Sequence, residues 1–135
     1  MGRKLIDANV ILRYLLKDNR SLFERASDFL EKVKTGAELV IIPESVLSEC
    51  VYVLMKIYRI GRPTIAEKLR GLFAYKGVMN PDKKDLMDSL NLFEKTQLSI
   101  VDCILCAKSL NHDMFLFTFD EDLRKICSKN LSSQF

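Results

Sequence analysis

Three short apolar runs, separated by longer amphipathic segments, restrict the folds open to this chain. The runs are KLIDAN at residues 4–9, ELVIIP at 38–43 and MFLFTF at 114–119. Each is long enough for one strand, and such near-continuous apolar runs are typical of parallel sheets buried on both faces. Strands that alternate with helices predict an α/β fold with three layers, α/β/α, around a central, mainly parallel sheet.

The intervening segments carry the signals that begin and end helices. The side chains expected to act as helix N-caps are those of Asn9, Ser21, Thr64 and Ser99. These signals predict helices over residues 10–17, 21–35, 43–59, 64–75, 82–95, 100–110 and 120–126. The polar tail at 128–135 is expected to form a short edge strand or to fray.

Length and composition indicate a folded protein of one domain, residues 1–135, with 48% hydrophobic and 29% charged residues. Asp7, Asn9 and Arg13 interrupt the one N-terminal run that resembles a signal peptide. No apolar segment approaches the ~20 residues of a membrane helix. Without a secretion signal, the four cysteines are expected to be reduced thiols, and the protein to be cytoplasmic.

Two acids follow apolar runs directly. Asp7 ends the first run, and Asp120 comes just after the third. The carboxyl ends of parallel strands meet at one edge of a sheet, where ligands bind, so we expect these two side chains to be neighbours. A charge flanked by apolar residues costs on the order of several kcal/mol unless something pairs with it. Asp7 therefore requires a partner.

Two further acids, Glu49 and Asp102, lie on predicted helices with apolar residues three and four positions away. Capping alone could account for single acids, because Asp102 could belong to a capping arrangement with Ser99, and Asp120 could be only a helix cap. The four acids together are better explained by a divalent cation, since several ionised carboxylates share a site only around a positive centre. Ligation by oxygen alone favours Mg²⁺ or Mn²⁺.

The distribution of charge agrees with a polyanionic substrate. Formal net charge is only +3, but removing four acids from the 18 leaves 14 against 21 basic residues, a balance of +7. Many of the basic residues lie between 56 and 84. An acidic, metal-filled pocket bordered by basic residues suits the hydrolysis of a nucleic acid. Each basic residue taken alone could equally belong to an ordinary solvated helix face.

The candidate acids fall in four blocks, LIDANVILRYLL, PESVLSECVYVL, SIVDCILCA and FTFDEDL. In this order and spacing the blocks resemble the signature motifs of PIN-domain ribonucleases, most closely the VapC-type toxins of toxin–antitoxin pairs. The resemblance spans residues 4–126. It implies a PIN-like sheet of four to five strands, although the family's last strand is often more apolar than the tail of this chain.

The resemblance implies a Mg²⁺- or Mn²⁺-dependent endoribonuclease that hydrolyses RNA phosphodiesters with a metal-activated water. The residues implied as metal ligands and catalytic groups are Asp7, Glu49, Asp102 and Asp120. The polar side chains expected to orient them are Asn9, Ser99 and Thr118. It also implies a homodimer and a cognate antitoxin protein, for which apolar residues between 43 and 75 could supply the contact surface.

Competing functions would each need residues in a different arrangement. Cys103 and Cys106 have C-x-x-C spacing, but no second close pair completes a zinc site, so core packing is the better interpretation. His112 is the only histidine and follows a polar turn, which disfavours a Ser–His–acid hydrolase. A non-catalytic PIN-like module that binds RNA or protein has no use for four acids. A structure-specific DNA nuclease would need more chain than 135 residues offer.

Overall fold

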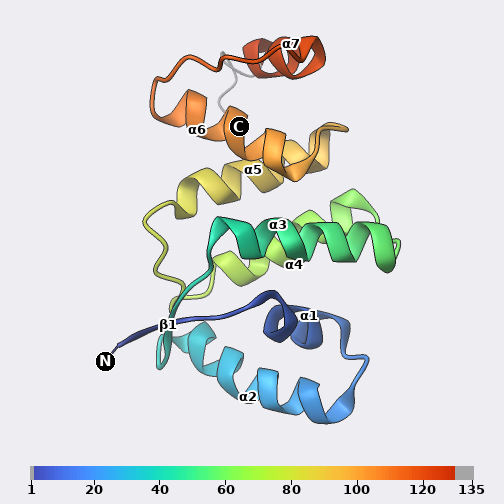
Figure 1. Cartoon of the computed structure of the whole chain (residues 1–135). Coiled ribbons are helices and arrows are strands. Elements are labelled where there is room, and N and C mark those ends of the chain that lie inside the picture. The colour runs from blue at the N-terminus through green and yellow to red at the C-terminus, as the bar shows by residue number, and fades with distance from the viewer. Residues whose placement is uncertain (1, 130–135) are drawn as a thin grey trace. The chain divides into compact units, whose positions relative to one another are not determined.

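The computed structural model describes residues 2–129, and the chain divides into two compact units, Met1–Lys83 and Lys84–Phe135. Each unit is described by itself below. Figure 1 follows the chain by colour from the N-terminus to the C-terminus and labels its elements. Among the described residues no helix is both long and apolar enough to cross a membrane.

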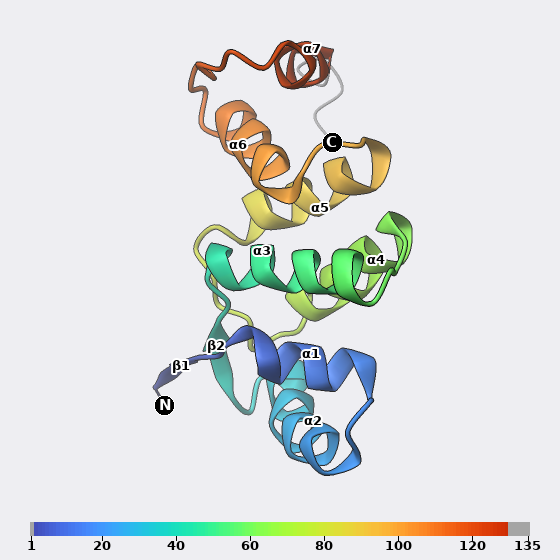
Figure 2. The same cartoon turned by 45° about the vertical axis from the view of Figure 1, so that its right-hand side comes forward.

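The first unit contains a small parallel sheet. β1 (Arg3–Leu5) pairs with β2 (Leu39–Ile41), with Lys4 opposite Val40, and Val78 forms an isolated parallel bridge to Val40. Figure 2 shows the two strands side by side. The α/β class and the first two strands are confirmed, whereas the larger sheet of four to five strands stays a prediction.

Helices make up most of the first unit. The strands are connected by α1 (Ala8–Leu16) and α2 (Arg20–Thr35), which pack against each other. After β2 come α3 (Glu44–Tyr52), its π-helical continuation η1 (Val53–Ile57), and α4 (Arg62–Phe73). The fully buried side chains at the centre of this unit include Ile11, Leu30, Val40, Ile42, Leu47, Leu54, Ile65, Leu69 and Phe73.

Gly77 allows the chain after α4 to return directly onto β2. Its carbonyl accepts a hydrogen bond from the Val40 N–H, and its own N–H donates to the Val33 carbonyl, each at 2.8 Å. A Cβ atom at this position would lie 2.1 Å from the Glu38 carbonyl oxygen. The absence of a side chain therefore permits this close backbone approach, which extends the edge of the sheet.

The second unit is helical in its described part. It consists of α5 (Lys83–Lys95), whose first residue closes the first unit, followed by α6 (Ile100–Asn111) and α7 (Glu121–Lys129). A disulfide between Cys106 and Cys127 joins α6 to α7, with the two Cα atoms 5.6 Å apart. The expectation of four reduced thiols is therefore wrong for this pair, because two helices distant in sequence bring them within bonding range. Core packing of Cys103 and Cys106 is confirmed, since both side chains are fully buried.

The predicted strand at 114–119 is wrong. These residues form no strand, and Phe115, Phe117 and Phe119 are 88%, 76% and 90% exposed. A near-continuous apolar run favours a strand, but a strand also needs a neighbour for its backbone hydrogen bonds, and residues 84–129 contain none. The predicted edge strand in the tail begins inside α7 at Ser128, and residues 130–135 lie outside the described part of the chain.

Three predicted N-caps are displaced by two or three residues. Asp7, rather than Asn9, caps α1, and Asn19, rather than Ser21, caps α2. The helix expected to start at Thr64 begins at Arg62. Each displacement lengthens the helix at its N-terminus. The cap Ser99 is confirmed at the start of α6.

Candidate functional site

Asp7 lies where the chain leaves β1 and enters α1. Its backbone is extended, with φ −94° and ψ 172°, and its Oδ1 atom accepts a hydrogen bond from the Val10 N–H at 3.2 Å. The side chain is exposed and borders a surface hollow that includes Pro43 and Val46. The positive end of the α1 dipole and the Val10 N–H are the partners that stabilise the charge of Asp7. Because the side chain is exposed, the expected cost of burying this charge does not arise.

Glu49 lies on α3, and the contact between α3 and α1 brings it to the same region as Asp7. The intervening residue is Cys50, whose buried thiol donates to the Ala8 carbonyl at a sulfur–oxygen distance of 3.9 Å. Burial, together with the negative charges of Glu49 and Asp7, raises the pKa of Cys50 to about 12. Asp7 directly precedes Ala8 and Glu49 directly precedes Cys50, so this contact brings together the two chain segments that carry these candidate acids.

The other two candidate acids, Asp102 and Asp120, belong to the second unit, and both lie at helix N-termini. The Asp102 N–H donates to the Ser99 Oγ atom at 3.2 Å in the first turn of α6. Asp120 precedes α7, and its Oδ1 atom accepts from the Leu123 N–H at 2.9 Å. The Asp120 N–H in turn donates to the Thr118 Oγ1 atom at 3.0 Å. The capping roles considered for these residues are therefore real.

The exposure of the four acids differs from what the sequence predicts. Asp7, Glu49 and Asp120 are exposed and Asp102 is half-buried, so their placement carries no large cost of burying charge. Asn9 is also exposed, and its side chain forms no hydrogen bond with that of Asp7. The apolar residues three positions after Glu49 and Asp102 lie on the same helix faces as these acids, but they are themselves exposed, Tyr52 at 59% and Leu105 at 45%, so they do not bury the acids. The case for these four acids as metal ligands therefore depends on their positions in the structure, and not on a cost of removing their charges from water.

The donor set fits a hard divalent cation. All four candidate ligands are carboxylates open to solvent, which is the chemistry that Mg²⁺ and Mn²⁺ take. Zinc fits poorly, because Cys50 and Cys103 are buried and Cys106 is in a disulfide. Within its described residues, neither unit gathers three or more His, Cys, Asp or Glu side chains that could bind a metal by themselves.

A polar cluster in the second unit was not expected from the sequence. Asn111 donates from its amide to Asp85 and to Asp88, at 2.9 Å each, and the His112 Nε2 atom lies 2.8 Å from Asp85. Lys84 pairs with Asp88 at 2.7 Å. Both carboxylates are buried, at 5% and 8% exposure. The sequence did contain one indication of this cluster, namely two acids three positions apart on a helix face that is otherwise apolar.

This cluster ties the end of α6 to α5. Burial alone would raise the pKa of Asp85, but hydrogen bonds from Asn111 and His112 outweigh it and hold that pKa below its ordinary value. Every polar contact here satisfies a buried carboxylate. We therefore assign the cluster a structural role in the second unit.

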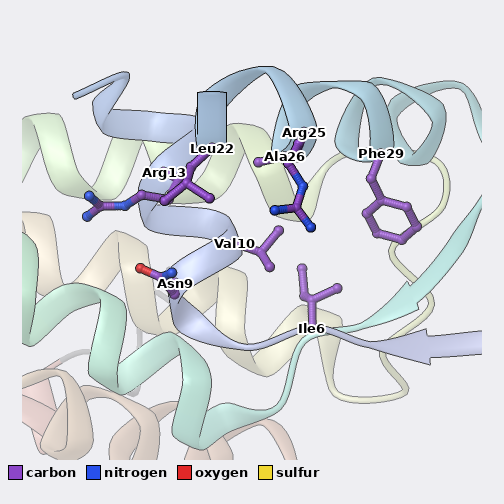
Figure 3. A pocket seen from close by; sticks show the side chains of 8 residues that line it. All are labelled: Ile6, Asn9, Val10, Arg13, Leu22, Arg25, Ala26 and Phe29. Carbon is purple, nitrogen blue, oxygen red and sulfur yellow. The ribbon is translucent and has the colours of Figure 1, made fainter. Parts of the chain in front are cut away.

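A pocket of 290 Å³ lies between the start of α1 and one side of α2 (Figure 3). Ile6, Val10 and Ala26 give it an apolar lining, and Phe29 borders it. It lies beside Asp7 in the chain, since Ile6 directly precedes that residue. Nothing in the sequence indicated this pocket, because its two walls come from separate helices.

Comparisons with known proteins agree with the four sequence blocks. The family model for the PIN domain matches residues 4–129, a range that runs through both units. A curated relative, the VapC ribonuclease of Aquifex aeolicus (strain VF5), is 26% identical over 106 residues. That alignment covers 78% of this chain and 78% of the relative.

Proposed function

The chain belongs to the PIN-domain family, and we propose that it is a divalent-metal-dependent endoribonuclease, the toxin of a VapC-type pair. The family match across both units supports one functional domain, residues 1–135. The substrate is RNA, the cognate antitoxin is the protein partner, and the protein acts in the cytoplasm.

One observation carries this proposal, namely the contact between Cys50 and Ala8, by which α1 and α3 bring together the chain segments that carry Asp7 and Glu49. These residues come from two of the four blocks that resemble the family's motifs. Helix capping does not explain why a carboxylate lies at position 49, because Glu49 lies past the first turn of α3. Two carboxylates brought together at the surface favour the binding of a cation.

We propose that Asp7, Glu49, Asp102 and Asp120 hold one or two Mg²⁺ or Mn²⁺ ions. When bound, the metal would supply a lowered pKa for the attacking water and positive charge for the phosphoryl oxygens. The protein's own part is to fix the carboxylates. Hydrogen bonds to Oδ1 from the Val10 and Leu123 N–H groups fix the rotamers of Asp7 and Asp120.

The hydroxyl groups of Ser99 and Thr118 do not bind metal in this proposal but position two of the proposed ligands. Each accepts a backbone N–H, from Asp102 and from Asp120, and so sets where the chain turns into α6 and α7. Asn9 follows Asp7 by two residues and is proposed to help position it. Exposed basic residues on η1 and α4, among them Lys56 and Lys68, suit the RNA backbone.

We also propose a homodimer and an antitoxin groove on the surface of residues 43–75. Leu72 and Phe73 lie within this range but are buried in the core, so they are not part of this surface. Ile57 and Tyr52 are 64% and 59% exposed and are the apolar side chains available on α3 and η1. An arginine of the antitoxin that reaches the four acids would pair with their charge and displace the metal.

The proposed function is tested by comparing two carboxylates of the same helix. Glu49→Gln removes a proposed metal ligand, whereas Glu44→Gln removes a carboxylate of the first turn of α3 that is not part of the proposed site. Cleavage of total RNA should be lost in the first variant and retained in the second. Chelation with EDTA should abolish cleavage by the wild-type protein, and added Mn²⁺ should restore it. Equal activity in both variants, or activity that resists EDTA, would refute the assignment.

A further inference from the structure

The pocket between α1 and α2 is separate from the four proposed metal ligands but adjacent to one of them. Ile6 and Asn9 both line it, and Asp7 lies between them in the chain. Val10, which donates the capping hydrogen bond to Asp7, lines it as well. Ile6 and Val10 line both this pocket and the surface hollow that Asp7 borders, so the two sites are neighbours on the surface.

Two arginines border the pocket, and one of them is paired with a carboxylate while the other is not. Arg13 is paired with Asp18 at 2.8 Å and also contacts the Tyr58 hydroxyl. Arg25 forms no hydrogen bond or ion pair with any residue between 2 and 129. Figure 3 shows its guanidinium group directed from α2 toward Val10, over the pocket. The pocket thus carries one positive charge that no described carboxylate compensates.

We propose that this pocket binds one nucleotide of single-stranded RNA beside the phosphodiester that is cleaved, an inference that rests on the proposed ribonuclease function. Arg25 contacts the phosphate, because a guanidinium group matches its oxygens with two parallel hydrogen bonds. The base lies on the half-buried Phe29 ring, as unpaired bases stack on aromatic side chains in RNA-binding proteins. The Asn9 amide, both donor and acceptor, contacts the edge of the base.

The dimensions and charge of the pocket favour a nucleotide over a protein segment. A helix is about 10–12 Å across with its side chains, and 290 Å³ admits a single planar group rather than a helix. The apolar lining suits the face of a base, and the unpaired Arg25 suits an anion. RNA supplies both in one repeating unit.

Binding of RNA by the full chain tests the inference. The parent is the Asp7→Asn protein, which is expected to bind RNA without cutting it, and the probes are fluorescein-labelled poly(A), poly(C) and poly(U). Fluorescence anisotropy at several salt concentrations gives the affinity and its salt dependence. In that parent, Arg25→Gln should weaken binding and lower the slope of log K against log salt by about 0.7, the value for one phosphate of a single strand. Phe29→Leu should weaken binding about tenfold with an unchanged slope.

Lys32→Gln is the matched control, because it removes one positive charge from the same helix at an exposed position outside the pocket. Its effect on affinity should be less than about twofold, since Lys32 does not line the pocket and so does not contact the bound phosphate. If affinity and slope stay the same in both pocket variants, the inference is overturned, and the pocket does not bind RNA. If the wild-type protein cleaves no RNA and the parent binds none, the proposed function itself fails.

Discussion

At the scale of single residues, Asp7 combines a structural and a proposed chemical role in one side chain. Its Oδ1 atom closes the first turn of α1 by accepting the Val10 N–H, and its negative charge lies at the positive end of that helix. Asparagine caps helices as well as aspartate does, but lacks the charge that a cation requires. The two roles can therefore be separated by substitution.

Asp7→Asn should leave the free energy of unfolding unchanged to within about 0.5 kcal/mol, because the cap is kept. Asp7→Ala should cost about 1 kcal/mol, because the first turn of α1 loses its acceptor. Both variants should be inactive on RNA. Urea denaturation without metal measures the first effect and an RNA cleavage assay the second. An active Asp7→Asn protein would remove Asp7 from the site.

At the scale of elements, the contrast between two glycines shows how the chain after α4 is held. Gly71 lies within α4, and a Cβ atom added there would meet nothing within 4 Å, whereas at Gly77 it would meet the backbone of Val33 and Glu38. Gly71→Ala should stabilise the protein by about 0.5–1 kcal/mol through helix propensity. Gly77→Ala should destabilise it by about 1–3 kcal/mol, because backbone must shift. Thermal unfolding of the two variants gives both signs, and equal signs would contradict this packing.

The contact between α5 and the end of α6 predicts a dependence of stability on pH. The folded-state pKa of Asp85 lies below its ordinary value of 3.8, so its ionised form stabilises the fold above that value. This contribution should disappear as the pH falls below about 4 and through the folded-state pKa. Asp85→Asn lacks it at every pH. The stability difference between wild type and variant, from urea denaturation, should therefore narrow on acidification; a constant difference would contradict the ionic role.

The elements that could be predicted from sequence are those whose signals are local. Ser99 caps α6 because its hydroxyl needs only the backbone three residues ahead. The strand expected at 114–119 failed because an apolar run is a local signal but strand pairing is not. Two candidate acids were found by their position after apolar runs and two by apolar neighbours on predicted helices. Their exposure was not predicted, since sequence neighbours do not reveal what covers a side chain. Asp85 was missed because its partners lie on another helix.

At the scale of the whole molecule, the two units each contribute a pair of the proposed ligands. Asp7 and Glu49 belong to the first unit, and Asp102 and Asp120 to the second. The family match runs through both. If one cation site uses all four acids, then its affinity for metal depends on residues from each unit, and no single carboxylate is dispensable.

Binding of Mn²⁺ to the full chain, followed by electron paramagnetic resonance of the free ion, tests the proposed ligands most directly. We expect that Asp7→Asn and Asp102→Asn each weaken Mn²⁺ binding by at least about tenfold, since each removes a proposed charged ligand. Wild-type affinity for Mn²⁺ in either variant would contradict the assignment of that residue as a ligand.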